Sequence, residues 1–333
     1  MGRQRNRRAG RSAALVAAAT SLALMPCVGS RDAIDVVSSS TAVATTGSIP
    51  RAAAEHRYRI GAKLRFGLFS AGRDNIGSAV MTSRSSGDAT AFALLAGSDP
   101  NRVPGKLNRW AYVREEVRGE SADVFTLRSD DSAPDESRDG SDDRPFNAAC
   151  TTFTPQDVHT SVTTIAAPGA TYRTFERLLE QLELTPGNWS GRRIARPPDS
   201  EPGFLTALHR LLATAPIQGG RGVTYVFNNK LYDLSARRVK ALGPTTVGSR
   251  RFEQLTRVDL TIRNRASGEN TRFALTTAHD ETGVTFPVQI FFQPSFWIVV
   301  ELRLDDQADV PHDPADDGSL LTRMRDICAS VAR

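Results

Sequence analysis

The chain has 333 residues, enough for one large domain or two modest ones. Hydrophobic residues make up 40% and charged residues 24%, a globular composition that excludes a fully disordered or fibrous protein. Five of the 42 basic residues lie in the first thirty positions, so the remainder carries 37 basic and 37 acidic residues. A chain balanced in this way has no net field that attracts nucleic-acid phosphates, and no nucleic-acid partner is predicted.

Residues 1–30 have the pattern of a secretory signal peptide. Five arginines precede an apolar run over residues 13–25, and Val-Gly-Ser at 28–30 offers small side chains for cleavage. The run is shorter than the roughly 20 apolar residues that a membrane-spanning helix needs. We therefore expect export to the periplasm or the extracellular space, without a transmembrane segment in the mature chain. Lipid anchoring at Cys27 and a buried N-terminal helix are the alternatives.

Cysteine usage agrees with an exported protein. Beyond the leader the chain keeps Cys150 and Cys328. In an oxidising compartment the two pair if the fold brings them together, and otherwise they are two separate buried thiols. The sequence leaves both possibilities open.

The region that follows the leader is predicted to be β. Residues 31–55 are rich in Ser, Thr and Ala without any period, which indicates a flexible tether. Apolar and basic side chains then alternate over residues 57–69, as in a half-solvated strand. Further strands complete an N-terminal β region over residues 56–128. Residues 129–145, with seven acidic and two basic side chains, are predicted to be a disordered acidic loop.

The loop at 97–109 is the most distinctive local feature of this region. It combines two prolines and two glycines with the cations Arg102, Lys106 and Arg109. A fixed backbone with convergent guanidinium groups suits an anionic ligand. A rigid polar turn with solvated cations is the alternative.

Residues 146–331 are predicted to join β-strands with helices. Residues 146–165 form one or two Thr-rich strands. Leucine and phenylalanine then recur at helical spacing, and an amphipathic pattern ends the chain. These patterns predict helices near 171–184, 203–213 and 318–331.

Between the second and third of these helices, residues 222–304 alternate as strands do. Asn228 and Asn229 predict a tight hairpin turn, because Asn tolerates positive φ. Pro287 and Pro294 predict a strand edge, a bulge or a strand end, because proline gives no N–H to a central ladder.

Aromatic side chains of this segment are the candidate ligand-binding groups. In the consecutive pairs Phe291-Phe292 and Phe296-Trp297, one member faces away from the core and meets a covering helix or lines a pocket. With the two arginines of the 97–109 loop, the predicted ligand-binding residues are Trp297, Tyr232, Phe292, Arg102 and Arg109.

The last strand of the segment sets the expected faces. Its fully apolar side is the predicted core face and consists of Phe296, Ile298, Val300 and Leu302. Trp297 shares the other face with Glu301, which predicts that this face is partly wet. Trp297 is then half exposed at the mouth of a groove.

The usual catalytic signatures are absent from the sequence, which has no nucleophile elbow, zinc-protease motif, nucleotide-binding glycine loop or Cys-x-x-Cys. Residues 312–317, His-Asp-Pro-Ala-Asp-Asp, come nearest to a metal cluster. They also suit a polar linker that ends in a helix cap, the interpretation that we adopt. No metal or cofactor is predicted. A hydrolase site assembled only by folding is the rival hypothesis, and its candidate residues are Asp99, Arg102, Arg109 and His209.

Four strand segments of the chain carry a resemblance: Val-Thr-Tyr-Val-Phe-Asn-Asn-Lys-Leu-Tyr-Asp-Leu from residue 223, Arg-Phe-Ala-Leu from 272, Phe-Pro-Val-Gln-Ile from 286, and Trp-Ile-Val-Val-Glu-Leu from 297. Their rhythm over residues 200–305 resembles uncharacterised bacterial exported β-rich domains. These are similar in outline to half-barrel envelope proteins that carry lipid or lipoprotein. The resemblance implies a non-enzymatic envelope role and supplies no catalytic residues.

Together these patterns predict a mainly β (α+β) protein, with an antiparallel meander or half-barrel sheet and two or three covering helices. The leading functional hypothesis is a non-enzymatic module that binds a lipid, another apolar ligand or an envelope protein. A secreted hydrolase and a purely structural interaction module are the alternatives.

Overall fold

The computed structural model describes residues 54–66, 69–103, 108–129, 145–168, 170–213, 219–280, 283–295 and 298–332. In this part the chain is mainly β, with helices packed on a large, open, antiparallel sheet, as the sequence predicts. The predicted leader lies outside the described residues, as do most of the tether and most of the acidic loop. Ala54 and Glu55, which we assigned to the tether, already belong to the first strand.

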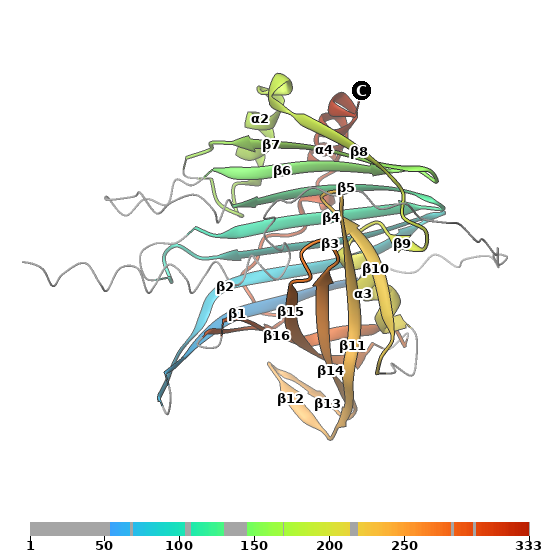
Figure 1. The fold of residues 1–333 in the computed structure, drawn as a ribbon. Helices are drawn as coiled ribbons and strands as arrows, with labels where there is room; N and C mark the ends of the chain where they lie inside the picture. Colours follow the sequence, from blue (N-terminus) through green and yellow to red (C-terminus); the bar gives the residue numbers. More distant parts are fainter. Residues whose placement is uncertain are drawn as a thin grey trace, which may run out of the picture.

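The sheet has fifteen strands within the described residues, and its order shows how the chain is laid down (Figure 1). One half follows the chain directly, each strand pairing with the next: β1 (Ala54–Phe66), β2 (Phe69–Ser86), β3 (Ala89–Ser98), β4 (Trp110–Arg118), β5 (Ser121–Ser129), β6 (Phe146–Phe153), β7 (Asp157–Ile165) and β8 (Ser190–Ala195). The other half continues from β1 with β17 (Ile298–Leu304), β16 (Thr285–Ser295), β15 (Asn270–His279), β14 (Leu255–Asn264), β11 (Lys230–Leu242), β10 (Gly222–Phe227) and β9 (Ser200–Glu201).

Strand pairing joins the two predicted β regions into this single sheet. β5 pairs with β6 across the acidic loop, and β1 pairs with β17 at the middle of the sheet. The short β9 runs parallel to β10, and the other described pairs are antiparallel. A separate hairpin, β12 (Thr245–Val247) with β13 (Arg250–Phe252), interrupts the second half.

Three α-helices of the described chain cover the sheet: α2 (Phe175–Glu183), α3 (Phe204–Ala213) and α4 (Gly318–Val331). Leu208 of α3 belongs to a core cluster shared with the second half of the sheet, whereas α2 and α4 pack over a cluster that contains Tyr112. The clusters lie on opposite faces of the first half, because the neighbours Leu94 and Leu95 belong to different ones. The three helices fall where the sequence predicts them.

The predicted turns and bulges are confirmed. Asn228 and Asn229 have φ of 48° and 57° at the turn between β10 and β11. On β16 the register slips beside Pro287, and again between Phe292 and Ser295, the interval that contains Pro294. A bulge therefore accommodates each proline inside the sheet. The strands β8 and β9 and the β12–β13 hairpin have no counterpart among the predicted elements.

One face of β17 is as predicted and the other is not. Val300 and Leu302 are 0% and 2% exposed in the cluster with α3, which confirms the core face. Glu301, expected on a partly wet face, is only 7% exposed. It is covered because its carboxylate forms ion pairs with Arg303 at 2.8 Å and with Lys63 at 3.5 Å. Trp297 lies outside the described residues.

A disulfide joins Cys150 of β6 to Cys328 of α4, with 5.3 Å between the two Cα atoms. It settles the alternative that the sequence left open. The bond closes a loop across 178 positions and ties the C-terminal helix to the sheet. Disulfides persist in oxidising compartments, so this bond is consistent with the predicted export.

Candidate functional site

The candidate site lies where β17 stops short of its neighbours. β17 ends at Leu304, opposite Tyr58 of β1, while β1 and β16 extend farther in the same direction. The Tyr58 hydroxyl donates a 2.8 Å hydrogen bond to the carbonyl oxygen of Pro287 on β16. Beside it, the rings of His56 and Phe286 stack with centroids 4.2 Å apart and 2° between their planes. These two contacts join β1 to β16 across the missing strand.

A mainly apolar pocket opens between this junction and α3. Its cavity volume is about 60 Å³. α3 contributes residues at the helical spacing that places side chains on one stripe, namely Leu205, Leu208, His209 and Leu212. The facing wall comes from β1, β2, β3 and β16 and includes Ala54, Met81, Phe92, Phe286 and Pro287. The pocket is thus closed on one side by sheet and on the other by a single helix.

A buried carboxylate fixes α3 over the pocket. Glu115 of β4 is 1% exposed and accepts hydrogen bonds from the backbone N–H groups of Leu205 at 2.8 Å and Thr206 at 2.7 Å. The Thr206 hydroxyl donates a third bond to it, at 2.6 Å. Burial raises the pKa of Glu115, although these hydrogen bonds oppose the shift. A Cβ at position 203 would collide with the carboxylate, which explains the glycine there.

Three titratable side chains line the mainly apolar pocket, namely His56, His209 and Asp280, beside the hydroxyl residues Thr82, Ser83 and Thr285. The His209 ring lies 4.8 Å from the ring of Phe92, tilted by 39°. Burial lowers the pKa of His56, and the positive charge of Arg250 lowers it further. Asp280, together with Asp306 and Glu55, opposes this shift. The His56 imidazole is therefore mainly neutral at pH 7.

The structure distributes the predicted ligand-binding residues over several places. Tyr232 is 1% exposed and stacks on Tyr225 with ring centroids 5.3 Å apart, and Phe292 is 4% exposed. Both belong to the core cluster that contains the α3 leucines, and neither lines the pocket. Arg102 pairs with Asp99 at 3.1 Å, while Arg109 is buried. The fifth predicted residue, Trp297, lies outside the described part of the chain.

The residues of the hydrolase hypothesis divide into two groups. Asp99, Arg102 and Arg109 belong to the segment between β3 and β4, in which Asp99 and Arg102 form an ion pair and Arg109 is buried. His209 lines the α3 pocket together with His56 and Asp280. No motif in the sequence marks His56 and Asp280 as site residues, because only the register of β1, β16 and β17 brings them to a common cavity.

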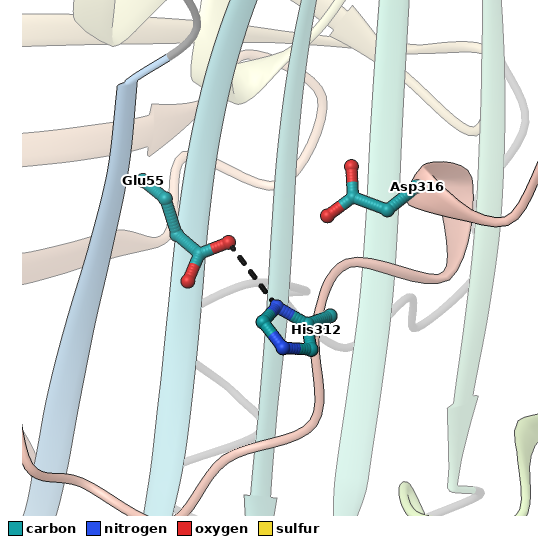
Figure 2. Close-up of side chains that lie close together, drawn as sticks. All are labelled: Glu55, His312 and Asp316. Carbon is teal, nitrogen blue, oxygen red and sulfur yellow. Dashed lines mark ion pairs between the residues drawn. The ribbon is translucent and has the colours of Figure 1, made fainter.

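Glu55, His312 and Asp316 form a second cluster, on the surface (Figure 2). His312 Nδ1 lies 3.7 Å from a carboxylate oxygen of Glu55. Arg57 donates to the same carboxylate at 2.7 Å, and Arg84 pairs with Asp316. Because guanidinium groups already occupy both carboxylates, the cluster is an ion-pair network and we assign it no metal.

The neighbouring aspartates confirm the predicted helix-capping role of residues 312–317. Asp313 is 2% exposed and accepts from the N–H of Ala315 at 2.9 Å, as well as from the Thr82 and Tyr112 hydroxyls. Asp317 accepts from the N–H of Ser319 at 2.8 Å and so caps α4. The linker is thereby tied both to the helix and to the sheet.

Comparison with known proteins gives the chain no family assignment. A search against protein-family models found no match, and searches of curated proteins and of solved structures found no similar chain. Among the described helices, none combines the length and the apolar character needed to cross a membrane.

Proposed function

We propose that the protein binds the apolar part of a small ligand in the pocket between α3 and the ends of β1, β2 and β16. The observation that carries this proposal is the stripe of Leu205, Leu208 and Leu212, which belongs to a core cluster and also lines a cavity. Protein interiors contain few voids larger than one water molecule. A cavity lined by leucine, methionine and phenylalanine favours an apolar guest over water.

The size of the pocket limits what it holds in this conformation. A cavity of about 60 Å³ accepts a short hydrocarbon segment and not a whole lipid. A longer ligand would require α3 to move away from the sheet. Glu115 holds the first turn of α3, so such a movement would pivot on the N-terminal end of the helix and widen the pocket near Leu212.

The setting that we propose for this activity is outside the cytoplasm. The basic and then apolar leader predicts export, and the Cys150–Cys328 disulfide is consistent with an oxidising compartment. We therefore propose a non-enzymatic carrier or receptor for an apolar molecule, and the lipid-carrier resemblance of residues 200–305 supports the same class.

A neutral fluorescent probe tests the pocket directly. N-phenyl-1-naphthylamine is expected to bind with a saturable rise in fluorescence, and Leu208→Trp is expected to lower its affinity at least tenfold by filling the cavity. Ala213→Trp adds the same indole to an exposed position of α3 and is the matched control. Ala54→Trp narrows the pocket from β1, so it tests the same point should Leu208→Trp disturb folding. Equal probe affinity in all four proteins would contradict the proposal.

A further inference from the structure

A second hollow lies on the other face of the sheet, between α4 and strands β4 to β6. Its cavity volume is about 260 Å³. We call it the α4 groove. Its apolar side includes Phe125, Leu321 and Met324, beside the disulfide half Cys328. Phe125 and Met324 belong to the cluster under α2 and α4, whereas the α3 pocket belongs to the opposite cluster. The two sites are therefore separated by the sheet.

The polar side of the α4 groove is built around one buried carboxylate. Glu116 is 7% exposed and lies between three arginines. Arg114 donates to it at 3.1 Å, Arg325 of α4 donates at 2.9 and 3.0 Å, and Arg118 contacts it as well. The alternation of β4 explains this grouping, because residues 114, 116 and 118 all face α4.

The charges that line the groove do not cancel. The cations are Arg114, Arg118 and Arg325, and the anions are Glu116 and Asp123, which lies 3.5 Å from Arg118. One positive charge remains uncompensated among the lining residues. Arg114 is itself only 9% exposed, so part of this charge is removed from bulk water. A partly desolvated excess charge attracts a counter-ion more strongly than an exposed one does.

Arg325 and Arg118 carry more N–H donors than their contacts with Glu116 use. A guanidinium carries five N–H donors. Arg325 reaches both Glu116 oxygens through Nη2 alone, and its side chain is 52% exposed. Arg118 is 42% exposed and contacts Glu116 Oε1, an oxygen that Arg325 also reaches. A planar carboxylate is the group that such forked donors bind best.

We propose that the α4 groove is a binding site for a small monoanionic amphiphile, with its carboxylate at Arg118 and Arg325 and its short apolar tail along Leu321 and Met324. The single excess charge selects a monoanion over a dianion. The volume of about 260 Å³ lies just below the roughly 300 Å³ of the smallest drug-sized pockets, which sets the length of the tail. This site is independent of the proposed function of the α3 pocket.

Three probes separate the head from the tail: octanoate has both, acetate has only the charge, and 1-octanol has only the tail. Calorimetric titration is done with the full-length, disulfide-bonded protein carrying Leu208→Trp, so that the α3 pocket is filled. Octanoate is expected to bind one per chain, at least tenfold more tightly than acetate or 1-octanol. No saturable octanoate binding, or equal binding of 1-octanol, would overturn the proposal.

Arginine variants then locate the site. Arg118→Gln with Arg325→Gln is expected to weaken octanoate binding at least tenfold. Arg251→Gln removes an equally charged but 70% exposed side chain on β13, in the hairpin that is separate from the large sheet, and is expected to leave binding unchanged. Should the double variant fail to fold, Arg118→Gln alone keeps Arg114 and Arg325 on Glu116 and is expected to lower affinity at least threefold. Unchanged octanoate affinity in a folded Arg118 variant would place the ligand elsewhere.

Discussion

Glu115 of β4 and Thr206 of α3 are joined by two hydrogen bonds to one carboxylate oxygen, from the Thr206 N–H at 2.7 Å and from its hydroxyl at 2.6 Å. The carboxylate acts as the N-terminal cap of α3, but it comes from a strand 91 positions earlier in the chain. A negative group at a helix N-terminus is favourable, because the first N–H groups lack partners within the helix. This contact decides where α3 lies over the sheet.

Replacing Glu115 by Ala is therefore expected to lower the free energy of unfolding by about 1–3 kcal/mol, because buried N–H donors lose their acceptor. Urea unfolding at pH 7 measures the change. Glu120→Ala alters an exposed glutamate of the β4–β5 turn and is the matched control. A Glu115→Ala protein as stable as this control would show that water or another group replaces the carboxylate.

The local elements of this fold were predictable, and their assembly was not. The helix at 318–331 was predicted to the residue, because its apolar spacing and Asp317 both mark it. The sequence predicts a strand over residues 90–96, whereas β3 runs from Ala89 to Ser98, since residues 91–98 are all buried and show no alternation at their ends. Residues of this strand face a core on both sides, so a pattern that assumes one wet face describes them poorly.

The candidate site, too, depends on an assembly of strands that the sequence does not predict. His56 stands near the start of the first strand and Asp280 follows β15, and no spacing in the sequence links them. They meet because β17 inserts between β1 and β16 and then ends at Leu304. Glu115 and Glu116 likewise looked alike in sequence, yet they serve opposite faces of β4. Strand register, which the sequence leaves undetermined, creates both sites.

The core face of β17 gives a packing prediction. Leu302→Ala is expected to lower the free energy of unfolding by about 2–5 kcal/mol, because the side chain is 2% exposed and leaves a cavity. Glu253→Ala breaks an exposed ion pair with Arg251 and is expected to change stability by less than about 1 kcal/mol. Denaturant unfolding of the two variants makes the comparison. Similar losses of stability in Leu302→Ala and Glu253→Ala would mean that the core face of β17 repacks around the smaller side chain.

The disulfide gives a prediction that depends on loop length. Replacing Cys150 and Cys328 by Ser is expected to lower the free energy of unfolding by about 3–5 kcal/mol, because a loop across 178 positions is no longer closed in the unfolded chain. Wild-type protein unfolded with and without reductant is the companion measurement. Reduced wild type should have the same free energy of unfolding as the double variant. An unfolding midpoint that does not change with reductant would contradict the Cys150–Cys328 disulfide.

Glu116 predicts an acid-dependent loss of stability. Burial raises the pKa of this carboxyl, but the Arg325 hydrogen bond and the charges of Arg114 and Arg118 outweigh it, so the net pKa is lowered from 4.5. A lowered carboxyl pKa stabilises the fold above the unfolded value and loses this contribution as the pH falls through the folded value. Wild type should therefore lose its stability advantage over Glu116→Gln below about pH 4.5. If the difference in stability between wild type and Glu116→Gln does not change with pH, the ionisation of Glu116 is not linked to folding.

His56 predicts a response at milder pH, with a clear sign. Its pKa is lowered below 6.5 chiefly by burial, so the unfolded chain takes up the proton more readily than the folded chain does. Stability from this residue is thus complete above about pH 6.5 and declines as the pH falls toward the folded pKa. His56→Phe keeps a ring against Phe286 but cannot titrate. Thermal unfolding between pH 7.5 and pH 5 should show a smaller loss of stability for the variant than for wild type.

The neutral probe in the α3 pocket should likewise bind wild type less tightly at pH 5 than at pH 7.5, because a charged imidazole disfavours an apolar guest. Its affinity for His56→Phe should change less over the same pH range. If the stability and the probe affinity of the two proteins depend on pH in the same way, His56 is not the group whose protonation weakens folding and binding at low pH.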